Sequence, residues 1–447
     1  MVDLATGVDL DAYLHSLDRF GIRLGLDAMG RVCEALGHPE RRFRSLIIAG
    51  TNGKGSVSAM TESVLRTAGH RTGRYTSPPL VRIEERVAIG GRPIAAADFR
   101  EAVQHVQHAI DRLLTDGRLT VQPTYFEVTT AAAFVAFQRA AVDVAVLEVG
   151  LGGRFDATNV VTPMAVAITS VDLDHQAQLG NTLSSIAREK AWVIKPGAVV
   201  ILGERRPEVR ELVRATCAER NADFVDAFAR TSIVVDVGAH ATTLSLTTPD
   251  RCYGRLALAL SGRHQATNAV TAVRLLEELD RRGIRVPPRS VADGLRDTVW
   301  PGRLQWLQLP GGHALLDGAH NPAAARAVAD YFTDTQQRPL PIVFAVMRDK
   351  DTTAMVEALA PYASTIICTA VPHARARPAH ELANRVRAHC PGLHVDTERE
   401  PLAALARAFR GDTRVCATGS IYLVGHLLAR LTRPQPVCDA EAQPSSG

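Results

Sequence analysis

The sequence is short of the features that mark secreted, membrane-spanning and disulfide-bonded proteins. Its seven cysteines are scattered, odd in number and free of any C-x-x-C pair, which excludes a disulfide framework and a thiolate zinc site. Its longest apolar stretches, such as 131–137, fall far below the roughly 18 residues that span a bilayer. The first residues lack the basic and apolar segments of a secretory signal. We therefore expect a soluble, cytoplasmic protein with reduced thiols.

The chain also has little excess of charge of either sign, because it contains 51 basic and 47 acidic residues and its net charge is only +4. Without a basic field, nucleic acid and membranes are excluded as the main partners, and any anionic ligand must be held by a few placed groups. With 46% hydrophobic and 22% charged residues, the composition excludes collagen-like, low-complexity and wholly disordered chains. At about 150 residues per domain, 447 residues predict two or three domains.

Short apolar runs alternate with segments of helical spacing along the chain. The runs at 45–50, 142–150, 164–170 and 197–203 are continuous, which is typical of strands covered on both faces. They predict an α/β fold with a P-loop-type doubly wound sheet over 1–299. Residues 226–261 predict a small β-rich insertion that caps one edge of this sheet.

The segment WPGRLQW at 300–306 interrupts both helix and strand, and marks the expected domain boundary. A second alternating series over 300–432 predicts a smaller, Rossmann-like α/β domain. The tail 433–447 is rich in Pro, Ser, Gln and Ala, and is expected to be disordered.

The Gly-rich segment AGTNGKGS, residues 49–56, lies between an apolar run and an amphipathic helical pattern. Glycines let backbone N–H groups close around phosphate, and a helix N-terminus favours negative charge. Lys54 can reach a terminal phosphate and Ser56 can ligate Mg²⁺. The segment is not a strict G-x-x-x-x-G-K-[ST] match, because Gly55 follows the lysine. The alternative is a strand-to-helix turn that binds nothing, but the flanking elements favour a phosphate site.

Glu148 ends the second apolar run and His175 follows the third, and open α/β sheets bind ligands at the carboxyl ends of strands. Glu148 is therefore a candidate Mg²⁺ ligand, although an acid at a strand end is more often solvated. A lone histidine such as His175 usually satisfies a local hydrogen bond. By its own sequence context, Lys190 is an ordinary lysine on a helix surface.

The chain resembles the folylpolyglutamate synthases and dihydrofolate synthases, which are ATP-dependent amide ligases related to the Mur ligases. The resemblance covers most of residues 20–430. It rests on separated motifs in family order: AGTNGKGS (49–56), YFEVTTAAAF (125–134), LEVGLGGRFDATN (147–159), DLDH (172–175), IAREKA (186–191), SGRHQATNA (261–269), WPGRLQ (300–305), DGAHNP (317–322) and TGSIYLVG (418–425).

The resemblance implies an ATP site divided between the two domains. The implied ATP-binding residues are Asn52, Gly53, Lys54, Gly55, Ser56, Asn268, Arg303 and Asp317. The implied Mg²⁺ ligands are Ser56, Glu148 and His175, and the implied catalytic residues are Lys54, Lys190, Arg303 and His320. Lys190 matches a lysine that is carbamylated in many members of the family.

The resemblance also implies that Thr124, Phe126 and Asp156 contact a pterin-bearing substrate. An aromatic face and a carboxylate suit a flat heterocycle that is rich in donors, whereas core packing is the alternative for Phe126 alone. The chain departs from the family where many relatives read S-P-H-L, D-L-G and E-K-A-G-I. It has Pro79 in the first motif, Arg23 in the second and Trp192 in the third.

The implied activity is ATP-dependent addition of L-glutamate to a folate, and to dihydropteroate, with Mg²⁺ and through an acyl phosphate. We expect a monomer whose partners are these small molecules alone. Two alternatives remain open at this point. One is a ligase of the same fold that acts on another carboxylic acid, and the other is a nucleotide-binding regulatory protein without acyl transfer.

Overall fold

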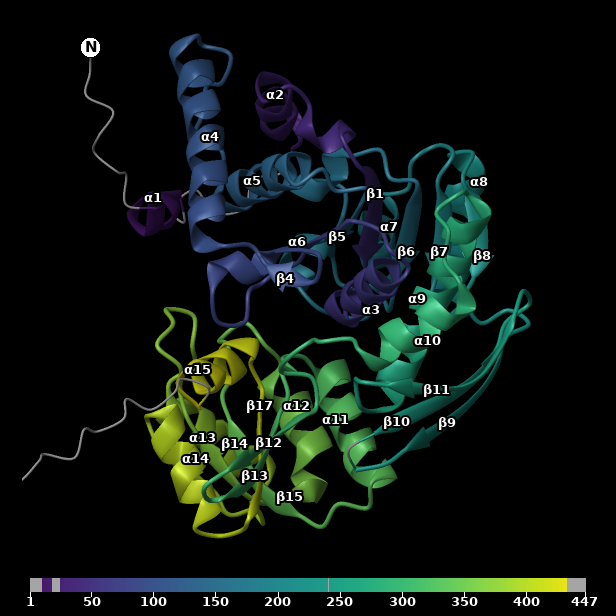
Figure 1. Ribbon diagram of the computed structural model, residues 1–447. Coiled ribbons are helices and arrows are strands. Elements are labelled where there is room, and N and C mark those ends of the chain that lie inside the picture. Colours follow the sequence, from purple (N-terminus) through teal and green to yellow (C-terminus); the bar gives the residue numbers. More distant parts are fainter. Residues whose placement is uncertain (1–9, 18–24, 240, 432–447) are drawn as a thin grey trace, which may run out of the picture.

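The computed structural model describes residues 10–17, 25–239 and 241–431 (Figure 1). The expected disordered tail 433–447 and the departure at Arg23 lie outside these residues. Within these residues, the strands form three sheets. None of the described helices combines the length and the apolar character of a membrane span.

The first sheet has eight strands in the order β4-β3-β2-β5-β1-β6-β7-β8. The strands from β2 to β8 along this order are parallel, and an antiparallel pair, β3 and β4, forms one edge. Their bounds are β1 Arg44–Ala49, β2 Thr72–Tyr75, β3 Val87–Ile89, β4 Arg92–Pro93, β5 Val144–Glu148, β6 Ala165–Ile168, β7 Val199–Leu202 and β8 Asp223–Asp226.

Both faces of this sheet are covered by helices, which explains the continuous apolar runs. On β1, Ile47 packs into one core with α2, α4, α5, α7 and α8, while Leu46 and Ile48 pack into another core with α3, α9 and α10. The helices of this half are α1 Leu10–Leu17, α2 Asp27–Ala35, α3 Lys54–Thr67, α4 Ala96–Thr115, α5 Tyr125–Arg139, α6 Gln176–Leu179, α7 Leu183–Ala191, α8 Pro207–Glu219, α9 Arg263–Arg281 and α10 Pro288–Arg296. Short 3₁₀ turns are η2 Pro39–Arg41, η3 Ile83–Arg86 and η4 Ala157–Val160.

The predicted β-rich insertion is an antiparallel sheet of its own, in the order β11-β10-β9. Its strands are β9 Ser232–Val237, β10 Thr242–Thr247 and β11 Cys252–Leu258. Alternate leucines of β10 and β11, such as Leu244 and Leu256, are buried in the core that contains α9 and α10. The expected cap on the sheet edge is therefore wrong in its placement. Alternating apolarity buries one face of a ribbon on helices, and β8 is left as the edge strand.

The third sheet follows the linking segment 297–304 and has the order β12-β13-β17-β14-β15-β16. Its strands are β12 Gln305–Leu309, β13 Gly312–Leu316, β14 Leu340–Phe344, β15 Ala363–Cys368, β16 Val395–Thr397 and β17 Arg414–Thr418. Its helices are α11 Pro322–Asp334, α12 Thr352–Leu359, α13 Ala379–His389, α14 Pro401–Phe409 and α15 Ile421–Leu431, with the 3₁₀ turn η5 Ala360–Tyr362. β12 pairs antiparallel with β13, a hairpin that the sequence pattern does not predict.

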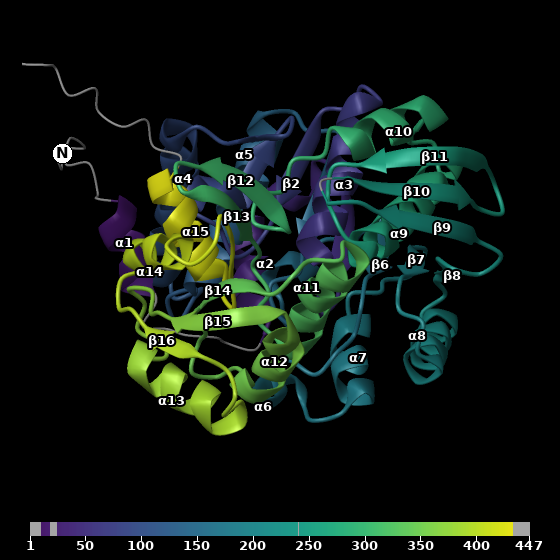
Figure 2. The same cartoon turned by 90° about the horizontal axis from the view of Figure 1, so that it is seen from below.

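The two halves lie against each other, with the insertion beside both of them (Figures 1 and 2). The Tyr331 hydroxyl on α11 donates a hydrogen bond of 2.6 Å to the Ala239 carbonyl of the insertion. The predicted fold class is confirmed: an α/β protein with a large parallel-sheet half, a small antiparallel insertion and a second α/β half. The carboxyl ends of β1, β5 and β6 face the second half, and the ligand cavity lies there.

Candidate functional site

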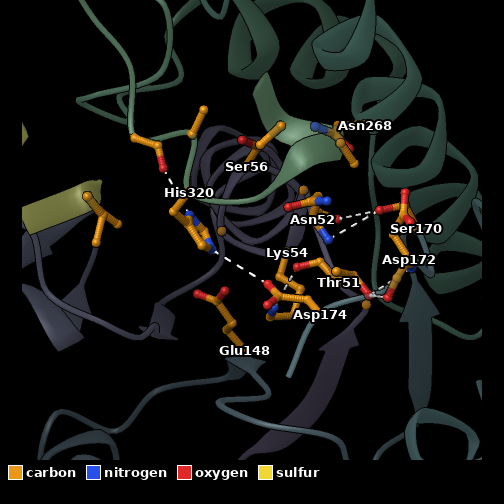
Figure 3. A pocket seen from close by; sticks show the side chains of 18 of the residues that line it. Thr51, Asn52, Lys54, Ser56, Glu148, Ser170, Asp172, Asp174, Asn268 and His320 are labelled. Carbon is orange, nitrogen blue, oxygen red and sulfur yellow. Dashed lines mark hydrogen bonds and ion pairs between the residues drawn. The ribbon is translucent and has the colours of Figure 1, made fainter. Parts of the chain in front are cut away.

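A cavity of about 380 Å³ lies between the two halves and is lined by residues of both (Figure 3). Its wall in the first half comes from the loop after β1, the ends of β5 and β6, and the N-terminal turn of α9. Its wall in the second half comes from the loop after β13 and the start of α11. All of the predicted ATP-binding, metal-binding and catalytic residues line this one cavity.

The loop between β1 and α3 is shaped as a phosphate cradle. Gly53 is the N-cap of α3 in the left-handed conformation, with φ of 85°, and a side chain there would collide with Asn268. The Lys54 ammonium donates to the Thr51 carbonyl at 3.1 Å, across the mouth of the loop. The Asn52 carbonyl accepts hydrogen bonds from the hydroxyls of Thr169 and Ser170, which fix the loop beside the end of β6. The first turn of α3 lines the cavity, and the N–H groups of a helix N-terminus favour an anion.

Glu148 ends β5 inside the cavity and is buried. Burial raises the pKa of its carboxyl group, and the charges of Lys54 and Arg303 and the Ser77 N–H oppose this rise. The Ser77 N–H donates to the carboxylate at 3.3 Å. A buried carboxylate held by one weak backbone bond has lone pairs left for a cation.

Ser56 and His175 supply the other two predicted metal donors. The Ser56 side chain is 2% exposed on the first turn of α3. His175 caps α6 in the left-handed conformation, with φ of 52°, and burial lowers the pKa of its imidazole, which favours the neutral form that ligates metals. The part of the chain that the structure describes has no group of three or more His, Cys, Asp or Glu side chains placed for a metal. The predicted set has only two such residues and a hydroxyl, so a cation there would complete its shell with phosphate oxygens and water.

Lys190 is not an ordinary surface lysine, and that alternative is wrong. It is 4% exposed on α7, and its ammonium donates to the Gly50 carbonyl at 2.8 Å. Burial, together with the nearby charge of Lys54, lowers the pKa of Lys190 to about 7. An amine that is uncharged near neutral pH can react with CO₂, as the predicted carbamylation requires.

The second half places Arg303, Asp317 and His320 on the opposite wall. The buried Asp317 carboxylate accepts from the N–H groups of Leu304 and Ala319, each at 2.8 Å, which fixes the linking segment to the end of β13. Burial raises the pKa of Asp317, and the charge of Arg303 opposes the rise. The His320 Nδ1 lies 2.9 Å from the Gly318 carbonyl, and burial lowers the pKa of this imidazole to about 4.

The structure adds cross-domain contacts that motif reading misses. The Lys350 Nζ of the second half lies 2.6 Å from the Asp174 Oδ1 of the first. Asn321 at the start of α11 donates to Asn52 at 2.9 Å and to Asp174 at 3.1 Å. One sequence signal could have identified Lys350: the chain has only four lysines, and Lys54, Lys190 and Lys350 all lie at this site.

A second cavity, of about 580 Å³, adjoins the first and shares with it Ser77, Gly150, His175 and His320. Thr124, Phe126 and Asp156, the predicted substrate-binding residues, line it together. Phe126 lies 6.0 Å from Tyr75, ring centre to ring centre.

Two of these three side chains are already engaged in local hydrogen bonds. Asp156 accepts from the N–H groups of Gly150 and Leu151 at 2.8 and 3.0 Å, and Thr124 is the N-cap of α5. Their evident structural role is to shape the cavity wall. Direct contact with a substrate stays a prediction for all three residues.

Arg86 is a further residue of this cavity that sequence reasoning missed. Its side chain is buried, and its Nε and Nη1 have no hydrogen-bond partner. The guanidinium lies 5.2 Å from the centre of the Tyr125 ring. A buried guanidinium at a cavity wall, with two nitrogens that have no hydrogen-bond partner, is suited to a carboxylate ligand.

The departure at Trp192 lies outside the walls of both cavities. The indole is 38% exposed and lies 4.4 Å, ring centre to guanidinium carbon, from each of Arg154 and Arg220. It does not line either cavity, although Lys190 is only two residues away. The departure at Pro79 lies next to Pro78, which lines both cavities.

Comparison with known families defines the class of the protein. Residues 48–276 match the Mur ligase middle domain, and residues 302–421 match the glutamate ligase domain of Mur ligases. The matches fall on either side of the linking segment, so the cavity lies between the two matched regions. The fold and the divided site are those of a Mur-type ligase.

The relatives give the family within this class. The chain is 32% identical over 429 residues to the dihydrofolate synthase/folylpolyglutamate synthase of Bacillus subtilis, covering 95% of this chain and 98% of the relative. The folylpolyglutamate synthase of Mycobacterium tuberculosis complexed with ADP is 30% identical, has a TM-score of 0.89, and covers 95% of this chain and 98% of its own. The Yersinia pestis bifunctional folylpolyglutamate synthase/dihydrofolate synthase complexed with AMPPNP and Mn ion is 29% identical, with a TM-score of 0.79 over 94% of this chain and 96% of its own. The chain therefore belongs to the folylpolyglutamate and dihydrofolate synthase family of Mur-type ligases.

Proposed function

We propose that the chain is an ATP-dependent ligase that joins L-glutamate to a folate, and to dihydropteroate. The observation that carries this proposal is the pair of adjoining cavities. One has a phosphate cradle and the other has the unpaired Arg86, and both share His175 and His320 in their walls. A carboxylic acid held by Arg86 therefore has a path to the terminal phosphate of ATP. The relative from Bacillus subtilis is a dihydrofolate synthase/folylpolyglutamate synthase, and this likeness favours a ligase over a regulatory protein without acyl transfer.

The reaction has two steps in which atoms and charges balance. A carboxylate oxygen of the acid attacks the γ-phosphorus of ATP, the bond to the β-phosphate oxygen breaks, and ADP leaves. The glutamate amine then attacks the carbonyl of the acyl phosphate, and phosphate leaves as the amide forms. The surplus amine proton needs an acceptor, and His320 is the candidate because its neutral imidazole lines both cavities, where the acyl phosphate and the amine would meet.

Lys54 and Arg303 face the transferring phosphoryl group from opposite walls, one from each half of the chain. Their positive charges would stabilise the negative charge that develops there. Closure between the halves also keeps water from the acyl phosphate before the amine arrives.

Ser56, Glu148 and His175 are the residues that would hold Mg²⁺. The donor set fits, since the Glu148 carboxyl is buried, which raises its pKa, and accepts only one long hydrogen bond, of 3.3 Å from the Ser77 N–H, so its oxygens are available to a cation. When bound, the ion neutralises charge on the phosphoryl group. Lys190 stands on the same wall, and a carbamate on it would add a second anion there.

We further propose that the enzyme works as a monomer in the cytoplasm, with its domains divided at 1–299 and 300–432. Residues of this one chain line both cavities, and no partner is needed to complete either wall. The six cysteines that the structure describes are unpaired, as in a reducing compartment. The matched regions end at 276 and begin again at 302, on either side of the proposed division.

The experiment that tests the proposal measures ADP release by the purified full chain with Mg²⁺-ATP and L-glutamate. Dihydropteroate and tetrahydrofolate are supplied separately, and the product is identified by mass. We expect release that depends on acceptor and on glutamate, with a mass gain of one glutamyl group. No release with either acceptor would overturn the folate assignment. Release with one acceptor alone would restrict the enzyme to that acceptor.

A further inference from the structure

The linking segment begins with an indole that packs on the phosphate loop from behind. Trp300 does not line either cavity, yet its Cζ2 and Cε2 atoms lie against Gly55 in the first turn of α3. A Cβ atom on Gly55 would come within 2.6 Å of Cζ2 and 2.9 Å of Cε2. Real Cβ atoms do not approach that closely, so the backbone of the loop and the indole are in direct van der Waals contact.

Backbone conformation does not explain the glycine at position 55. Gly55 lies in the α-helix and has no positive φ, unlike Gly53. The nearest atoms to a Cβ there all belong to Trp300. The indole alone therefore excludes a side chain at this position, and the two residues form a matched pair across the boundary of the domains.

A second contact fixes the ring from the side of the sheet. The Arg74 guanidinium, on β2, lies 4.8 Å from the centre of the Trp300 ring. Arg74 is buried and forms an ion pair of 3.7 Å with Glu62 on α3. The Nε1 of Trp300 is buried without a hydrogen-bond partner, so packing and the cation hold the ring rather than a hydrogen bond.

Beyond Trp300, the linking segment is short and firmly held at its other end. Gly302 turns the chain with φ of 72°, and its carbonyl accepts from the Gly318 N–H at 2.9 Å. Leu304 donates to Asp317 at 2.8 Å. Arg303 lies between these two anchors and reaches the cavity that contains Lys54.

We propose that Trp300 is a positioning residue for the transfer of phosphate. By seating on Gly55, the indole fixes the start of the linking segment on the phosphate loop, and thereby sets Arg303 opposite Lys54. The same packing also restricts movement of the phosphate loop, and so keeps its N–H groups in a fixed position. Ordinary core packing would stabilise the fold but would not couple position 300 to nucleotide binding. The inference rests on the proposed function for ATP binding and for phosphoryl transfer.

The first test is a double-mutant cycle on the full chain, with Gly55→Ala, Trp300→Phe and the combination of the two. Phenylalanine keeps an aromatic ring but removes the atoms that a Cβ at position 55 would meet. Gly55→Ala should weaken Mg²⁺-ADP binding about tenfold or more, because it displaces the loop or the ring. The double variant should bind more tightly than the product of the two single effects predicts. Independent effects would overturn the pairing.

The second test uses fluorescence, since the chain has only three tryptophans. Trp192→Phe with Trp306→Phe leaves Trp300 as the single emitter, and neither replaced residue lines a cavity. Mg²⁺-ADP should change the Trp300 emission with the same dissociation constant that calorimetry gives. Nucleotide binding by calorimetry without any change in emission would overturn the inference. Absence of nucleotide binding altogether would instead overturn the proposed function.

A third variant separates positioning from fold stability. Trp300→Ala should lower kcat through the loss of Arg303 alignment, and Trp300→Phe should recover a large part of it. Trp306→Ala is the matched control, because its indole contacts Tyr331 in the second half, at 2.9 Å from the hydroxyl, and lies away from the loop. Melting temperatures identify any loss caused by unfolding. Equal loss of kcat in Trp300→Ala and Trp306→Ala, at equal stability, would contradict a positioning role.

Discussion

The Lys350 Nζ lies 2.6 Å from the Asp174 Oδ1, and this ion pair joins the two halves of the chain beside the cavity. Both side chains are only 9% exposed, so water screens the pair weakly. Burial by itself would raise the pKa of Asp174, but the Lys350 ammonium and His175 outweigh it and hold the pKa well below its usual range. The second half therefore supplies the cation that contributes most to keeping the carboxylate before His175 charged.

Replacing Lys350 by methionine should therefore impair closure of the two halves. Asp174 would be left buried without its cation, so the closed arrangement would become less favourable than an open one. We expect kcat to fall about tenfold, with a smaller change in ADP affinity, because the cradle itself is intact. Steady-state kinetics and calorimetry measure the two quantities. Lys195→Met is the matched control, since Lys195 lines neither cavity. A normal kcat in Lys350→Met would contradict this role.

Lys54→Ala should nearly abolish turnover. The ammonium is the cation on the cradle itself, and its loss leaves charge on the transferring phosphoryl group without compensation from α3. A loss of kcat on the order of a hundredfold or more is expected, measured as ADP release at saturating ATP. Lys195→Ala serves as the control for the removal of a lysine. Near-normal turnover by Lys54→Ala would refute the assignment of the cradle.

The low pKa of Lys190, about 7, predicts that its carbamylation depends on pH. The ammonium form dominates below this pH and cannot add CO₂, whereas the free amine dominates above it. The carbamate, and the activity that depends on it, should therefore increase as pH rises through about 7. Carbon-13 NMR with labelled bicarbonate detects the carbamate directly, and Lys190→Arg should remove the signal. A signal that survives in Lys190→Arg, or one independent of pH, would contradict the prediction.

Arg86→Gln should weaken binding of the acid substrate and leave ATP binding intact. The guanidinium lines the second cavity and has unpaired nitrogens, so its charge is available to a carboxylate. The KM for tetrahydrofolate or dihydropteroate should rise on the order of tenfold, while the KM for ATP stays within error. Arg92→Gln on β4 is the control, since Arg92 is exposed and lines neither cavity. Equal rises in both KM values for Arg86→Gln would indicate a structural defect instead.

Much of the fold could be predicted because burial leaves a plain pattern in the sequence. Strands such as β1 and β5 have consecutive rather than alternating apolar residues, at 46–49 and 144–147, since helices cover both faces of the sheet. The edge hairpin formed by β12 has no such pattern, because its residues are only partly buried. The insertion packs on α9 and α10. Alternating apolarity predicts that one face of the insertion is buried, but not which helices cover it.

The candidate site divides in the same way. The apolar runs placed Lys54, Glu148 and His175 at or just beyond strand ends, and parallel strands end at the same edge, so all three line one cavity. The roles expected for Glu148 and His175 came from the family resemblance and stay predictions. The contacts of Lys350 and Trp300 join segments far apart in the chain, and no local pattern encodes such distances. For Asp156, the position was predicted but the contacts were not. It lies in the second cavity, as expected, but its side chain accepts hydrogen bonds from the loop 150–158, which the sequence did not indicate.

The most direct test of the account follows oxygen from the acid to phosphate. The reacting carboxyl group of the acceptor is labelled with ¹⁸O, and the phosphate released with Mg²⁺-ATP and L-glutamate is analysed by phosphorus NMR. An acyl phosphate formed by attack of the carboxylate on ATP requires one labelled oxygen to leave with each phosphate. We expect phosphate that carries one ¹⁸O atom and an amide that keeps the other. Phosphate without label, released alongside the glutamylated product, would contradict it.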